Sequence, residues 1–99
     1  MLDKEEILAF LRQNSAYLKN EFHITSIGLF GSFSRDEQDA QSDVDILFDL
    51  EEGTQNVHEL KQSLRQYLST SFGRSVDLAR ERYLKPYAKK YILKETIYV

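Results

Sequence analysis

Residues 30–46 read FGSFSRDEQDAQSDVDI and join two apolar segments of the chain. The first, residues 24–30, is short, β-branched at its start and followed by Gly31-Ser32, which predicts a strand and then a turn. The second, residues 44–50, predicts another strand, although aspartates stand at positions 43 and 45. Charges at the start of an apolar strand need a physical reason, so this stretch is the first candidate for a functional site.

Side-chain alternation places the two aspartates together. Successive side chains of a strand point to opposite faces, so Asp43 and Asp45 are expected on one face, about 7 Å apart along the chain. The residues expected to face the core instead are Val44, Ile46 and Phe48. Asp77 has the same setting, between the apolar residues Val76 and Leu78. Three carboxylates are therefore predicted to converge on one sheet face.

The other segments alternate between helical and strand patterns. Helices are predicted at residues 4–20, 32–39, 55–70 and 83–95, a third strand at 75–79, and an apolar end at 97–99. Asp3 is expected to cap the first helix, and Pro86 lies in the first turn of the last. Without a linker or repeat, residues 1–99 are predicted to form one α/β or α+β domain, a small sheet flanked by helices. The pattern leaves open whether the strands are parallel or mixed.

Composition narrows the classes of function. The chain has no cysteine, which excludes disulfides and cysteine-bound zinc. It has no signal-peptide pattern and no apolar run of the roughly 20 residues that span a bilayer, so a soluble, cytoplasmic protein without a membrane partner is expected. The net charge is −3, and residues 36–52 hold eight acids and no base. Stable nucleic-acid binding is therefore not expected.

The predicted carboxylate cluster favours a metal ion. Close carboxylates repel by about 1 kcal/mol per pair in water and about 4 at an effective dielectric constant of 20. Oxygen ligands without histidine or cysteine suit Mg²⁺, or Mn²⁺ in its place, and Mg²⁺ often completes its shell with nucleotide phosphates. Gly31 allows a phosphate to approach the backbone, and Ser32 offers a hydroxyl and amides. Each motif alone is common in turns and edge strands, but their combination indicates a nucleotide site.

At this spacing the residues resemble a known family. GSFSRDEQDAQSDVD matches the Gly-Ser, ten residues, Asp-x-Asp signature of the DNA polymerase β-like nucleotidyltransferases, and the ending SVDLARERYLKPYAKKYILKETIYV resembles its minimal members. These are the MNT antitoxins, which pair with HEPN-domain ribonuclease toxins in type VII-like toxin-antitoxin systems. The resemblance covers essentially the whole chain and implies the polymerase β-like fold with a mixed sheet.

The resemblance also implies roles for single residues. Gly31 and Ser32 match the triphosphate-binding pair, and Arg35 lies where relatives often have an arginine, although a solvated arginine is an equal alternative. The metal-binding and catalytic acids are implied to be Asp43, Asp45 and Asp77. The sequence departs from the family at Asp36, where glycine is usual, and this places a negative charge near the proposed phosphates.

The function implied is a Mg²⁺-dependent protein adenylyltransferase. AMP would pass from ATP to a tyrosine of the cognate HEPN toxin, which would be silenced, and pyrophosphate would be released. One alternative is an antitoxin that binds and occludes its toxin without catalysis, using the aromatic and basic residues of 82–99. Another is nucleotidyl transfer to RNA or a small molecule.

Overall fold

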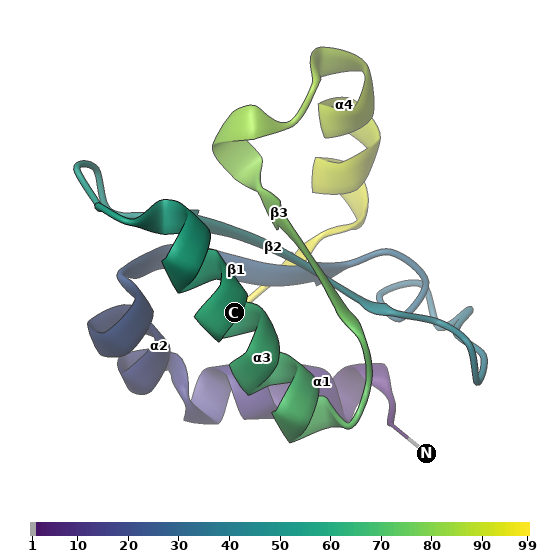
Figure 1. Ribbon diagram of the computed structural model, residues 1–99. Helices are drawn as coiled ribbons and strands as arrows, with labels where there is room; N and C mark the ends of the chain where they lie inside the picture. Colours follow the sequence, from purple (N-terminus) through teal and green to yellow (C-terminus); the bar gives the residue numbers. More distant parts are fainter. Residues whose placement is uncertain (1) are drawn as a thin grey trace.

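A four-stranded sheet lies between two sets of helices. The computed structural model describes residues 2–99, and Figure 1 shows α1, α2 and α3 on one side of the sheet and α4 on the other. The strands are β1 (Ile24–Phe30), β2 (Val44–Leu50), β3 (Val76–Arg80) and β4 (Ile97–Tyr98). The helices are α1 (Lys4–Gln13), α2 (Ser15–Phe22), α3 (Val57–Phe72), α4 (Pro86–Glu95) and the short 3₁₀ helix η1 (Glu81–Tyr83).

The sheet is mixed, with strand order β3-β2-β1-β4. β1 runs antiparallel to β2 and to β4, whereas β2 and β3 are parallel. This settles the strand order that periodicity left open, and the α/β fold with a mixed sheet agrees with the expectation. Because of these directions, the end of β1 and the starts of β2 and β3 lie at the same edge of the sheet, where the candidate residues lie.

The main core fills the space between the sheet and α1 to α3. The strand residues predicted to face inward are buried there, with Val44, Ile46 and Phe48 fully inaccessible. The opposite sheet face carries Asp45 and Leu47, and Leu47 is also fully buried, where η1 lies against β2. The candidate carboxylates therefore belong to the face away from the main core.

The single helix predicted at residues 4–20 is wrong, because the chain forms two helices separated at Asn14. Asn14 has φ −107° and ψ 17°, and its side-chain amide donates to the Phe10 carbonyl at 2.9 Å. Asparagine competes in this way with helical backbone hydrogen bonds, which is why it ends helices. The predicted cap is confirmed, since the Glu6 N–H donates to Asp3 Oδ1 at 2.9 Å.

The short helix predicted at residues 32–39 is also wrong, because the segment is a series of turns. The Ser34 N–H donates to the Gly31 carbonyl at 3.1 Å, and the Glu37 N–H donates to the Ser32 carbonyl at 2.9 Å. Asp36 then adopts a left-handed φ of 57°, which ends any helical continuation.

The helix predicted at residues 83–95 begins later than expected. Pro86 is its first residue, and Tyr83 belongs to η1 instead. Pro disfavours helical geometry in the residue before it, and Lys85 is extended. The helix predicted at 55–70 and the strand predicted at 75–79 differ from α3 and β3 by one or two residues at each end, while β1 and β2 have the predicted bounds.

Candidate active site

Gly31 lies directly against the carboxylate of Asp45. Phe30 is the register partner of Asp45 across β1 and β2, so the next residue turns beneath this side chain. A Cβ at Gly31 would lie 2.0 Å from Asp45 Oδ2, and the backbone has φ +78°. Glycine is therefore required here for space and for conformation.

Asp77 joins Asp45 from the neighbouring strand. The two residues are register partners in the parallel β2 and β3 pair. Adjacent strands lie about 4.8 Å apart, and register partners project from the same face. Asp43 lies one residue before β2 and is exposed, as is Asp77, whereas Asp45 is half-buried. The structure thus brings the three predicted acids to one edge of the sheet.

The electrostatics of this edge are centred on Asp45, whose pKa is raised from 3.8 to about 6. Burial is the largest cause, because it disfavours the charged form. The negative charges of Asp77, Asp43 and Glu95 act in the same direction, and Arg35 acts against them. The negative charge of Asp45 is thus costly in the folded protein.

The carboxylates fit an open magnesium site and not a closed one. Within residues 2–99, no group of three His, Cys, Asp or Glu side chains is arranged so that it could hold a metal ion by itself. Mg²⁺ is commonly bound by one or two carboxylates, with waters and substrate phosphates completing the octahedron. The in-register pair Asp45 and Asp77, with Asp43 close by, offers oxygen donors of that kind. The assignment of these three residues as metal ligands stays a prediction.

The groups predicted to bind phosphate face the same edge. Within residues 2–99, neither the backbone N–H nor the hydroxyl of Ser32 donates a hydrogen bond. The Arg35 guanidinium bonds Glu37 at 3.3 Å and Glu95 at 2.9 Å. The amide of Gly31 also donates to Glu95. Ser32 is therefore available to a ligand, while Gly31 and Arg35 are engaged by one carboxylate.

Glu95 was not among the predicted site residues. It is the last residue of α4 and lies 64 positions from Gly31 in the sequence. No spacing rule connects residues so far apart. The only signal in the sequence is that an acid ends a helix otherwise rich in lysine and tyrosine, and that signal is too weak to assign a role.

Asp36, the departure from the family pattern, has a structural explanation. Its φ of 57° is a conformation that glycine adopts freely and that aspartate tolerates better than most residues. Its carboxylate pairs with Lys4 of α1 at 3.0 Å. The negative charge is therefore directed toward α1 and partly compensated.

Arg74 holds the loop between Ser32 and Asp43, and sequence reasoning also missed this residue. Its guanidinium donates to the carbonyls of Asp39 and Ser42. It also lies over the ring of the buried Phe33, 5.2 Å from the centroid. Because Phe33 follows Ser32 and Ser42 precedes Asp43, Arg74 fixes both ends of the loop that carries the candidate residues.

Asp49 points to the same face of β2 as Asp45 but takes no part in the site. Its carboxylate accepts from Arg80 at 3.0 Å and from the Arg82 N–H at 3.2 Å. Its side chain is only 19% exposed. Asp49 is therefore excluded as the third acid because its carboxylate is already paired.

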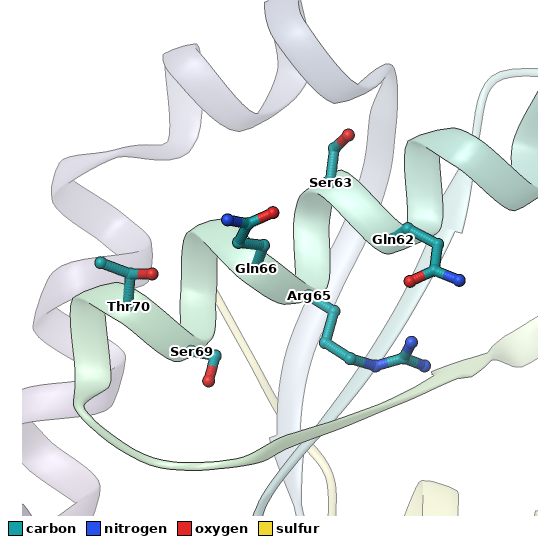
Figure 2. A pocket seen from close by; sticks show the side chains of 6 residues that line it. All are labelled: Gln62, Ser63, Arg65, Gln66, Ser69 and Thr70. Carbon is teal, nitrogen blue, oxygen red and sulfur yellow. The ribbon is translucent and has the colours of Figure 1, made fainter.

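Two further observations concern the rest of the surface. A shallow hollow runs along α3, and Figure 2 shows that all six side chains lining it come from that helix, so none of them is a candidate residue. They are Gln62, Ser63, Arg65, Gln66, Ser69 and Thr70. In the part of the chain that is described, no helix has the length and apolar character needed to cross a membrane.

Comparison with known proteins agrees with this geometry. The family model described as nucleotidyltransferase domain matches residues 5–99, so the chain belongs to that family. More narrowly, it is a minimal nucleotidyltransferase of the MntA type.

Three similar proteins illustrate this placement. The protein adenylyltransferase MntA of Thermococcus cleftensis is 38% identical over 99 residues, covering 100% of this chain and 98% of the relative. A solved structure provisionally described as a minimal nucleotidyltransferase has a TM-score of 0.79 and 30% identity, over 97% of this chain and 95% of the other. A solved toxin-antitoxin structure with AMP-PNP has a TM-score of 0.67 and 25% identity, over 98% of this chain and 72% of the other.

Proposed function

We propose that this protein is an antitoxin that transfers AMP from ATP to a tyrosine of its cognate HEPN ribonuclease toxin. The observation that carries the proposal is the placement of Asp45, which lies beside Asp77 on the neighbouring strand and directly against Gly31. Nucleotidyl transfer needs carboxylates for Mg²⁺ next to a backbone that phosphates can approach closely. The activity of the Thermococcus relative and the nucleotide analogue in the toxin-antitoxin structure support this choice of reaction.

In the proposed reaction, each residue acts on a particular group. Asp43 and Asp45 would hold Mg²⁺, which would offset the negative charge on the oxygens of the triphosphate. The free amide and hydroxyl of Ser32 donate to phosphate oxygens, and Arg35 neutralises part of their charge. Asp77 accepts the proton of the attacking tyrosine hydroxyl.

The bond changes balance without a further reactant. The tyrosine oxygen forms a bond to the α-phosphorus of ATP, and the bond from that phosphorus to the oxygen bridging to the β-phosphate breaks. The products are an AMP-tyrosine phosphodiester on the toxin and pyrophosphate. The proton moves from the tyrosine to Asp77 and then to solvent.

The test is incubation of the purified protein with α-labelled ATP, Mg²⁺ or Mn²⁺, and its cognate HEPN toxin. Label should appear on the toxin, and Asp43→Asn/Asp45→Asn should abolish it while the protein stays folded. Glu52→Gln is the matched control, because Glu52 is an exposed acid on the turn after β2. Absence of label with folded protein and toxin would refute the reaction, and label on supplied RNA or small molecules would redirect it to another acceptor.

A second candidate function, neutralisation by occlusion, is favoured by one separate observation. Tyr83, Tyr87 and Tyr91 on η1 and α4 are 70%, 75% and 69% exposed, which is unusual for large aromatic side chains. Such side chains, mixed with lysines, are typical of protein interfaces. Toxin-expressing cells distinguish the two functions, because the double aspartate variant would still rescue growth if occlusion is sufficient and would fail if transfer is required.

A further inference from the structure

The carboxylate of Glu95 lies where an anionic ligand would be expected. One of its oxygens, Oε2, accepts from the Gly31 amide and from the Arg35 guanidinium. The side chain is 25% exposed, so it is partly withdrawn from solvent without being locked in the core. An amide and a guanidinium converging on one oxygen are what a phosphate oxygen also requires.

The backbone that follows Glu95 is held in the sheet. If Glu95 leaves its partners, its side chain therefore has to move and its backbone does not. Directly after Glu95, β4 pairs with β1 through Leu29 and Ile97. Thr96 lies against Gly28, where a Cβ would be 2.7 Å from the threonine methyl carbon. A carboxylate on a fixed backbone leaves its partners by rotation about its side-chain bonds.

The negative charge of Glu95 would oppose a triphosphate bound at the same groups. Its negative charge adds to those of the aspartates, and it is one of the charges that act on Asp45. A triphosphate brought to Gly31 and Arg35 would meet this carboxylate as a like charge competing for the same donors. Both anions cannot accept from one amide at the same time.

We propose that Glu95 is an internal competitor of the nucleotide: its carboxylate holds Gly31 and Arg35 in the nucleotide-free protein and must rotate away before the triphosphate binds. The inference rests on the proposed nucleotidyl transfer. It assigns to Glu95 control of nucleotide affinity, in addition to the roles of the aspartates. A purely structural Glu95, which only orders Gly31 and Arg35, would have the opposite effect on binding when it is changed.

The experiment compares binding of AMP-PNP with Mg²⁺ to the full chain and to Glu95→Gln by titration calorimetry. Glutamine has the same shape and still accepts from the Gly31 amide, but it lacks the charge. We expect on the order of tenfold tighter binding by the variant, the effect of removing one competing charge at close range. Inorganic triphosphate should show the same gain, because the competition concerns phosphate oxygens.

Two further variants make the result decisive. Glu52→Gln removes one negative charge away from the site and should leave affinity unchanged. Glu95→Ala removes both the charge and the acceptor, and it should also bind more tightly, with folding checked by circular dichroism. Equal or weaker binding by Glu95→Gln, when the unaltered protein binds, would overturn the inference alone. If neither folded protein binds AMP-PNP or triphosphate, the proposed nucleotide chemistry fails and the inference fails with it.

Discussion

Asp45 on β2 and Asp77 on β3 are register partners in the only parallel strand pair of the described sheet, residues 2–99. Their carboxylates therefore leave the same face of neighbouring strands, and the negative charge of Asp77 raises the pKa of Asp45. Because Asp45 also lies over Gly31, the acid pair and the glycine turn form one unit.

The raised pKa of Asp45 predicts how stability depends on pH. The folded protein binds a proton at Asp45 more tightly than the unfolded chain does, with a pKa of about 6 against 3.8. The stabilising effect of this proton is complete below pH 4 and is lost as the pH rises through 6. Asp45→Asn should therefore raise the free energy of unfolding at pH 7.5, on the order of 1 kcal/mol after allowance for partial exposure, and should not raise it at pH 4. Urea unfolding at the two pH values measures this, and an equal gain at both would contradict it.

Gly31→Ala is predicted to lose activity for a reason that Gly53→Ala does not share. Both glycines have positive φ, +78° and +82°, so both alanine variants should lose about 1 kcal/mol of stability from the backbone. Only Gly31 meets another group, Asp45 Oδ2, while nothing lies within 4 Å of a Cβ at Gly53. Thermal unfolding and AMP transfer should show a larger stability loss and abolished transfer for Gly31→Ala alone. Retained transfer in this variant would show that Asp45 moves aside at no cost.

Arg74→Ala is predicted to loosen the loop between the phosphate and metal residues. The change removes hydrogen bonds to two carbonyls and a cation-π contact with Phe33, and should cost about 2 kcal/mol. Limited proteolysis should then cut within residues 32–43, and transfer should fall. Arg65→Ala on α3 is the control, because no hydrogen bond or ion pair of Arg65 is present within residues 2–99. Unchanged proteolysis in Arg74→Ala would show that the loop is held by other contacts.

The effect of the left-handed backbone at Asp36 on stability can be tested by two substitutions with different expected results. Asp36→Gly loses the pair with Lys4 but relieves the left-handed backbone, so stability should be kept or slightly raised. Asp36→Ala loses the pair and keeps the strain, and it should be less stable than the glycine variant by about 1 kcal/mol. Urea unfolding of the three proteins gives the order, and an alanine variant as stable as the glycine variant would contradict the role of the backbone.

Much of the fold could be predicted because it depends on local patterns. β1 and β2 have the predicted bounds, since apolar alternation and the Gly-Ser turn act over a few residues. The break at Asn14 was missed because apolar spacing continues across it, while the side-chain bond to the Phe10 carbonyl decides the local geometry. The helix expected at 32–39 does not form because Asp36 adopts a left-handed φ of 57°, which helical spacing of side chains does not predict.

The residues of the candidate site also fall into two groups, those that local sequence patterns predict and those that they do not. Gly31, Asp45 and Asp77 could be placed from strand parity and a short signature, and the structure brings them together. Glu95 and Arg74 could not, because each reaches the site through strand pairing and loop closure between distant parts of the chain. Residues such as Glu95 and Arg74 can be assigned to the site only when the order of the strands is known.

The segment η1 and α4 contains no buried residue, although it ends in the side chain that contacts Gly31 and Arg35. The turns of α4 that precede its anchored end at Glu95 bury so little apolar surface that they open locally at a small cost, well below that of global unfolding. Their amide hydrogens should therefore exchange with solvent faster than those of α3, whose Leu64 and Leu68 are inaccessible. Under the proposed competition between Glu95 and the nucleotide, a partner that clamps α4 would also set how firmly ATP is held.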